Sequence, residues 1–199
     1  MNEIETRTII ENIDEIKNNL NELGFINKGK FIQHDIMLDT PNAEIFNSMR
    51  KLRIRIENDK AELTYKGKFE DRDDLAKRIE LNINIDKSDI EKYIKIFSDI
   101  GYPVCFQIKK TRELWEKDNI KVTIDNWPIV GNMLEIEGEE EQIKYYCKKI
   151  APNYEFKNYL LKDLFKEKMK ETGKSIEELK VDYFNKTGFD LGKIELIVG

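Results

Sequence analysis

Two pairs of acidic residues are the first sign of chemistry in the sequence. Glu3 and Glu5 form one pair, and Glu135 and Glu137 form the other. In a β-strand this spacing places both carboxylates on one face, about 6.5–7 Å apart. Two such pairs brought together could hold one or two divalent cations. Carboxylate oxygens favour hard ions, so the expected metal is Mg²⁺ or Mn²⁺.

Arginine and lysine alternate with apolar residues in the same way, most clearly in LRIRIENDKAELTYKG at 52–67. Apolar side chains point one way and charged ones the other, on two strands connected by a turn at 58–59. The alternation recurs along the chain. The charged positions that it places on one face are Glu3, Glu5, Arg7, Arg53, Arg55, Glu62, Lys66, Arg78, Glu80, Lys110, Arg112, Asp125, Glu135 and Glu137.

This charged face has two interpretations. It could be the solvated outer face of a sheet whose other face packs on helices. Solvated faces are usually rich in Lys, Thr, Ser and Gln, whereas arginines and paired glutamates dominate here. That composition favours a closed barrel with the charges inside. Buried charges must be paired, and a triphosphate held by arginine and lysine, with its oxygens also on Mg²⁺, would satisfy both signs.

Hydrophobic periodicity predicts the strands that carry these residues. They are expected at 2–9, 31–39, 51–57, 61–66, 77–85, 104–116, 119–125 and 132–138, with a further short strand through KIELIVG at 193–199. The fold class predicted from this pattern is α+β, with about eight antiparallel strands and helices packed outside.

The predicted helices are marked by their ends. One at 12–23 stops at Gly24, and another runs from a capping box of Ser88 and Glu91 to Asp99. A second capping box, at Ser175 and Glu178, opens the last helix. The C-terminal helices are expected at 139–150, 156–171 and 176–187.

Two stretches of the chain resemble each other. EIETRTIIENIDEIKNNLNELGF aligns with ELNINIDKSDIEKYIKIFSDIGY so that Glu3 falls on Glu80. Duplication and chance similarity both explain this. No low-complexity linker separates the halves, so a single domain is predicted over 1–199, with a core at 1–150 and a C-terminal helical extension at 151–199.

Composition excludes several classes of function. The net charge of −5 gives no basis for general nucleic-acid binding. No stretch approaches the roughly 20 apolar residues of a membrane span, and MNEIETRTII is no signal peptide, so a cytoplasmic protein is expected. Cys105 and Cys147 lack metal-ligand spacing and are interpreted as reduced, packed thiols. The one histidine, His34, makes histidine-based catalysis and clustered-histidine metal sites improbable.

Six short segments follow one another in a recognisable order over residues 2–150, after an opening Glu3-Ile4-Glu5-Thr6-Arg7. They are LDTP, LRIRIE, LTYKG, KKTRELW, VTID and MLEIEG. Together they resemble the CYTH, or triphosphate tunnel metalloenzyme, family of class IV adenylyl cyclases, thiamine triphosphatases and inorganic triphosphatases. The opening segment is similar to the family signature Glu-x-Glu-x-Lys, with Arg7 in place of lysine.

Three further segments, FIQHDIML, YLLKDLFKE and VDYFNKTGFDL, are closer to the class IV cyclase branch of that family. Met37 and Leu38 depart from the branch, which usually has an aromatic pair there. The resemblance implies an eight-stranded antiparallel tunnel with the charged face inside. It also implies a homodimer.

The resemblance assigns roles to residues by motif. Mg²⁺ or Mn²⁺ would be held by Glu3, Glu5, Asp125, Glu135 and Glu137. Phosphate oxygens would be held by Arg7, Arg53, Arg55, Lys66, Lys110 and Arg112. The residues expected to act in catalysis are Glu3, Glu5, Arg7, Glu135 and Glu137. Salt bridges in the tunnel wall or contacts to substrate are expected for Glu62, Arg78 and Glu80.

Three functions fit these residues. The first is a metal-dependent triphosphatase acting on inorganic, nucleoside or other organic triphosphates. The second is a class IV adenylyl cyclase, which would convert ATP to cyclic AMP and pyrophosphate and would need a purine pocket. The third is a non-catalytic sensor of triphosphates. The C-terminal helices are expected to pack outside the barrel, the alternative being a lid in which Lys162 or Lys166 reaches the substrate. Packing is likewise expected of Trp115 and Trp127, with base stacking as the alternative.

Overall fold

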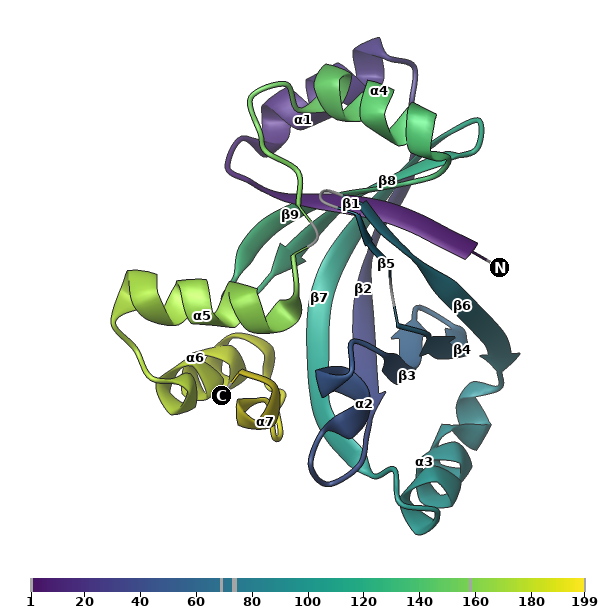
Figure 1. Cartoon of the computed structure of the whole chain (residues 1–199), viewed down its shortest axis with the longest axis vertical. Coiled ribbons are helices and arrows are strands. Elements are labelled where there is room, and N and C mark those ends of the chain that lie inside the picture. The colour runs from purple at the N-terminus through teal and green to yellow at the C-terminus, as the bar shows by residue number, and fades with distance from the viewer. Residues whose placement is uncertain (1, 69, 73–74, 158, 199) are drawn as a thin grey trace.

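A closed antiparallel barrel of eight strands forms the centre of the protein (Figure 1). The computed structural model describes residues 2–68, 70–72, 75–157 and 159–198. Neighbouring strands follow the order β1-β9-β8-β7-β2-β3-β4-β6, and pairing of β6 with β1 closes the ring. The strands are β1 (Asn2–Ile10), β2 (Ile26–Leu38), β3 (Lys51–Glu57), β4 (Lys60–Lys66), β6 (Leu75–Ile85), β7 (Val104–Lys117), β8 (Ile120–Trp127) and β9 (Gly131–Glu137). The predicted fold class is confirmed.

The strand register brings the acidic pairs of the sequence together. β1 lies between β6 and β9, so it is bonded on both edges. Glu5 lies opposite Glu137, and Arg7 lies opposite Glu135. Glu3 lies opposite Arg78 of β6. The residues with this parity point inward, because successive side chains on a strand alternate between its two faces.

Helices cover the outside of the barrel in three groups (Figure 1). α1 (Ile13–Glu22) and α4 (Glu140–Ile150) lie beside each other next to β1, β8 and β9. α3 (Ile90–Asp99) packs on β2 and β3, while α5 (Leu161–Thr172), α6 (Ile176–Thr187) and α7 (Glu195–Val198) lie beside β7. No helix in the described part of the chain is both long and apolar enough to cross a membrane.

Three apolar clusters hold these helices against the barrel. Ile16, Leu20 and Ile143 pack on outward residues of β8 and β9 such as Val122 and Ile136. Ile90 of α3 packs in a second cluster, and the α5–α7 group packs in a third that includes Cys105. Burial raises the pKa of the Cys105 thiol to about 11, which fits the predicted packing role. Because these apolar faces lie outside, most of the charged side chains of the strands point into the barrel interior.

The structure differs from the prediction at several elements. Residues 195–198 form helix α7, so the strand predicted at 193–199 is wrong over the described residues. Helix α5 begins at Leu161 and not at 156, because residues 151–157 run irregularly past β1 with Lys157 bonded to the Arg7 backbone. The short strand β5 (Glu70–Arg72) and helix α2 (Glu44–Asn47) were not predicted.

The two predicted capping boxes differ in outcome. Ser175 and Glu178 form one at α6. Ser88 does not, because its hydroxyl and backbone N–H both donate to Asp86, and a short 3₁₀ turn at 87–89 precedes α3. Gly24 ends α1 with a φ of +78°, a left-handed conformation that glycine adopts readily.

Candidate active site in the barrel interior

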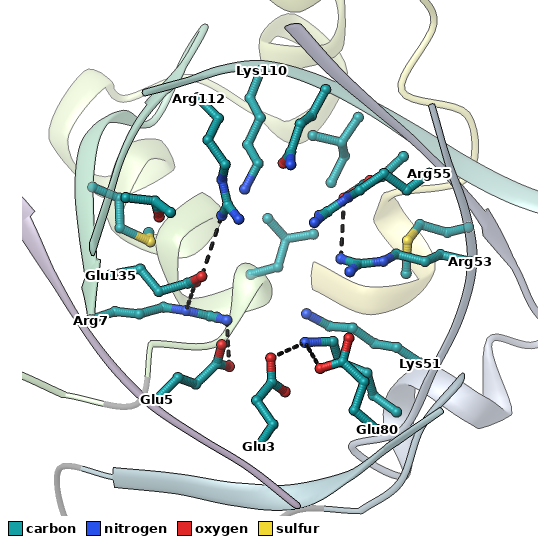
Figure 2. Close-up of a pocket in the computed structure, with 18 of the residues that line it drawn as sticks. Glu3, Glu5, Arg7, Lys51, Arg53, Arg55, Glu80, Lys110, Arg112 and Glu135 are labelled. Atoms are coloured by element: carbon teal, nitrogen blue, oxygen red, sulfur yellow. Dashed lines mark hydrogen bonds and ion pairs between the residues drawn. The ribbon is translucent and has the colours of Figure 1, made fainter. Parts of the chain in front are cut away.

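The barrel interior encloses a cavity of about 470 Å³. That size lies within the usual range for small-molecule sites. Charged side chains from β1, β3, β4, β6, β7 and β9 line its middle (Figure 2). Figure 2 shows the labelled residues converging on the centre of a ring of strands. They are Glu3, Glu5, Arg7, Lys51, Arg53, Arg55, Glu80, Lys110, Arg112 and Glu135, and Lys66, Arg78 and Glu137 also line the cavity.

A dense ionic network joins β1, β7, β8 and β9; we call it the β7–β9 cluster, comprising Arg7, Lys110, Arg112, Asp125 and Glu135. Arg112 donates two hydrogen bonds to Asp125, from Nε at 2.7 Å and from Nη2 at 2.6 Å. Lys110 donates to the same carboxylate. Arg7 Nε donates to Glu135 at 2.7 Å, and Arg112 Nη2 contacts Glu135 at 3.3 Å. Each cation of the cluster therefore has a carboxylate partner.

The pKa values follow from this pairing. Burial acts to raise the pKa of Glu135, but the charges of Arg7 and Arg112 outweigh it and hold the pKa well below its usual value. The pKa of Asp125 is lowered in the same way, because Arg112 and Lys110 outweigh burial. Burial and the charge of Arg112 lower the pKa of Lys110 to about 8. Both carboxylates are therefore ionised at neutral pH.

A second network joins β1, β4 and β6. Lys66 donates to Glu3 at 2.5 Å and lies 2.8 Å from Glu80. Arg78 donates to Glu3 at 3.0 Å and to Glu5 at 2.9 Å. Arg78 and Glu80 thus take part in salt bridges of the tunnel wall, one of the two roles predicted for them. Glu62 also lines the cavity and accepts a hydrogen bond from Thr64.

Ion pairing weakens along β3 from Arg55 toward Lys51. Arg55 donates two hydrogen bonds to Asp35, at 2.6 and 2.7 Å. Arg53 reaches Asp35 only at 3.5 Å, and its buried Nε has no hydrogen-bond partner in the part of the chain that the structure describes. Lys51 has no ion pair or hydrogen bond to its side chain among the described residues. We call Lys51 and Arg53 the β3 cations.

The two ends of the cavity differ in chemistry. At one end lie apolar residues that include Met37, Phe46, Phe106, Trp127 and Leu161, contributed by strands and by α2 and α5. At the other end lie Gln33, Glu57, Glu62, Asn82 and Glu116. The apolar end would shelter an organic group from water. The other end, which Phe31, Leu114 and Lys121 also line, carries carboxylates that would repel a polyanion.

The carboxylates suit a hard divalent cation in their donor type. Glu3, Glu5, Glu135 and Glu137 supply oxygen ligands from adjacent strands β1 and β9. Burial, with the nearby charges of Glu3 and Glu135, raises the pKa of Glu137, and the charge of Lys121 only partly opposes this shift. Among the described residues, no three of these carboxylates converge as a metal-binding group, and arginine and lysine bond to most of their oxygens.

All but one of the residues predicted for the site line the cavity. The exception, Asp125, lies buried behind Lys110 and Arg112. Lys110 points inward while Lys109 points outward and lies over the Phe189 ring, as strand alternation predicts. Lys162 lines the cavity, whereas Lys166 is exposed and does not. Trp115 is buried in the core, and Trp127 lines the cavity.

Sequence reasoning missed two residues of the site. Lys51 has the parity of Arg53 and Arg55 and lies one residue before the stretch at 52–67 in which the alternation is clearest. Asp35 has the inward parity of Gln33 on β2 and holds Arg55. In both cases the sequence signal is that the residue shares the inward parity of its strand. This signal identifies a site residue only once the neighbouring strand is known.

The family model described as the CYTH domain matches residues 1–145 of the chain. A candidate adenylate cyclase, MJ0240 from Methanocaldococcus jannaschii, is 32% identical over 138 residues, which cover 69% of this chain and 77% of that protein.

Solved structures share the fold. The PH1819 protein from Pyrococcus horikoshii OT3 is 26% identical, with a TM-score of 0.63 over 83% of this chain and 99% of that one. A candidate adenylyl cyclase from Hippeastrum, described as having a dominant triphosphatase activity, is 16% identical. It superimposes with a TM-score of 0.63 over 87% of this chain and 97% of that one, a likeness that shows the fold alone.

Proposed function

The chain belongs to the CYTH domain family, and from that premise we propose that it is a divalent-metal-dependent triphosphatase. The observation that carries the proposal is the convergence of arginine and lysine side chains from β1, β3, β4, β6 and β7 on one enclosed cavity. A triphosphate presents a row of anionic oxygens to such a lining, and charge-assisted hydrogen bonds to it are strong. The Hippeastrum protein's described activity is consistent with this reaction.

The chain's own groups provide what phosphoryl transfer requires. Arginines and lysines of the lining would stabilise charge that spreads over the phosphoryl oxygens and the leaving group. Bound by Glu3, Glu5, Glu135 and Glu137, Mg²⁺ or Mn²⁺ would neutralise phosphate charge as a Lewis acid. Asp125, predicted as a further ligand, instead holds Lys110 and Arg112 in place behind the lining. Carboxylates of the same set would position a water in line with the terminal phosphorus. The lone histidine, His34, bonds to Gln107 and packs on Phe189, away from the cavity lining.

The test is hydrolysis by the purified protein. Tripolyphosphate, ATP and thiamine triphosphate are each incubated with Mg²⁺, Mn²⁺ or EDTA, and products are separated by ion-exchange chromatography. We expect metal-dependent release of orthophosphate. Glu135→Gln removes the carboxylate that lies between Arg7 and Arg112, and it should lower turnover by about 100-fold or more. Turnover that survives in EDTA, or in this variant, would contradict the proposal.

An adenylyl cyclase is the second candidate. The apolar end of the cavity favours it, because Phe46, Trp127 and Leu161 could enclose a purine beside the cationic lining. The name of the M. jannaschii relative points the same way. Production of cyclic AMP and pyrophosphate from ATP would establish the cyclase. Binding of triphosphates without turnover of any substrate would instead establish a sensor.

A further inference from the structure

Lys51 is the tunnel cation whose charge the protein leaves least compensated. Its side chain is partly buried and, in Figure 2, points into the cavity. No ion pair holds its ammonium group among the residues that the structure describes. On the neighbouring strand it lies opposite another lysine, Lys66.

Four positive groups face Lys51 from four strands. They are Arg7 of β1, Arg53 of its own strand β3, Lys66 of β4 and Arg78 of β6. The nearest acidic groups on those strands are engaged elsewhere: Glu3 and Glu80 hold Lys66, and Glu3 and Glu5 hold Arg78. Burial and these four charges together lower the pKa of Lys51 well below its usual value.

An enclosed cation among cations is unfavourable unless an anion neutralises it. Arg53 adds to this uncompensated positive charge, because its buried Nε lacks a partner among the described residues and burial lowers its pKa. Lys51 lies two residues before Arg53 on the same face of β3. Arg53 itself lies opposite Met37, a residue of the apolar end. The unmatched positive charge therefore lies at the boundary between the charged middle and the apolar end.

We propose that Lys51, together with Arg53, forms an anion subsite that binds the phosphoryl group nearest the apolar end of the tunnel. This inference rests on the proposed function, since the anion it takes belongs to the triphosphate. It gives the substrate a direction: in an organic triphosphate, the phosphate attached to the organic group binds the β3 cations, and the remaining phosphates extend toward the β7–β9 cluster.

The experiment measures binding without turnover. Tripolyphosphate and inorganic phosphate are titrated by calorimetry into wild type, Lys51→Met and Lys60→Met in EDTA, each in two buffers with different ionisation enthalpies. Methionine keeps the length of the side chain without its charge. Lys60 is an exposed lysine of the same hairpin and serves as the matched control.

We expect Lys51→Met to weaken tripolyphosphate binding by about tenfold to 100-fold, as loss of a charge-assisted hydrogen bond does. Wild type should take up more protons on binding than Lys51→Met, because the anion favours the charged form of Lys51. In the absence of anions, Lys51→Met should raise the melting temperature, since it removes repulsion among the cations. Lys60→Met should change none of these quantities.

Unchanged affinity in Lys51→Met, or a melting temperature that falls without anions, would overturn the inference. Its failure and that of the proposed function are distinguishable. Hydrolysis with unchanged affinity in Lys51→Met would refute the subsite alone. Lysine-dependent binding by a wild-type protein that hydrolyses nothing would refute the triphosphatase alone. A wild type that binds neither anion would also refute the subsite.

Discussion

The β7–β9 cluster and the β3 cations lie on different sides of the same tunnel, yet their charges are compensated differently (Figure 2). In the cluster, Asp125 accepts from both Lys110 and Arg112, and Glu135 lies between Arg7 and Arg112. On β3, Arg53 has one contact at 3.5 Å and Lys51 has none to a described residue. The first region is complete without a ligand, and the second is not.

This difference separates two uses of charge in a protein interior. A fully paired network fixes its side chains in place before the substrate arrives, which favours catalysis by preorganised groups. Unpaired cations lower the stability of the ligand-free protein and recover that free energy when an anion binds. The tunnel thus combines the paired β7–β9 cluster with the β3 cations, whose charge an anionic ligand would neutralise.

The largest expected effect on stability comes from removing the shared carboxylate of the β7–β9 cluster. Asp125 is 1% exposed and neutralises two cations, so Asp125→Asn leaves Lys110 and Arg112 without their counter-charge. We expect the free energy of unfolding to fall by about 3 kcal/mol or more, as measured by urea denaturation. Asp59→Asn, at an exposed turn, is the control. A loss below about 1 kcal/mol would show that the cluster is not the stabilising unit described here.

Acidification tests a carboxylate on the other network. Burial opposes the shift, but a hydrogen bond with Glu3 and the charge of Lys66 lower the pKa of Glu80 from 4.5 to about 2. The stabilisation from Glu80 is therefore complete above pH 4.5 and is lost as the pH falls toward 2. Urea denaturation at pH 5 and pH 3 should show a steeper loss in wild type than in Glu80→Gln, by about 1–2 kcal/mol. Equal losses of unfolding free energy in the two proteins would contradict a stabilising role for ionised Glu80.

Replacing arginine with lysine in each region compares the β7–β9 cluster directly with the β3 cations. Arg112→Lys keeps the charge but loses the bidentate hydrogen bonding to Asp125, so it should destabilise the protein by about 1–2 kcal/mol. Arg53→Lys gives up only one long contact, and the ligand-free protein should change by about 0.5 kcal/mol or less. Urea denaturation of both variants gives the answer. Similar losses would mean that Arg53 is better paired than its distances indicate.

The smallest effect on stability is expected at Glu137. This carboxylate has a pKa raised by burial and contacts only the exposed Lys121 at 3.3 Å among the ion pairs described. Glu137→Gln should change the free energy of unfolding by about 0.5 kcal/mol or less while lowering metal-dependent turnover. Measuring both quantities beside Glu135→Gln separates a structural carboxylate from a ligand. Unchanged turnover would remove Glu137 from the proposed metal site.

Most of the barrel was predictable from the sequence because its strands alternate so regularly. Leu52, Ile54 and Ile56 needed an apolar covering, and the residues between them needed counter-charges, which requires a closed ring. The failures lie where local signals compete. KIELIVG has a strand-like composition, but its residues 195–198 form the short helix α7, and Ile194 and Ile197 pack in the cluster with Phe165 and Leu179. Tertiary packing outweighed propensity there.

The candidate site was predictable in its membership but not in its pairing. Alternation alone places Glu135 and Arg112 on the inward face. It does not show that Asp125 would be shared by Lys110 and Arg112, nor that Lys51 would find no partner among the described residues. Those features depend on the register of strands far apart in the sequence, such as Arg112 opposite Asp125 on β8.

The position of β1 also has a consequence for the order of folding. Its inward residues meet partners that follow much later in the chain, 75 residues on at Arg78 and 128 residues on at Glu135. Contacts so distant in sequence slow folding, and until β9 has been synthesised the barrel remains an incomplete sheet with unpaired edges. Inward-pointing charges on edge strands discourage pairing with other chains. The residues that line the tunnel therefore also protect the nascent chain from aggregation.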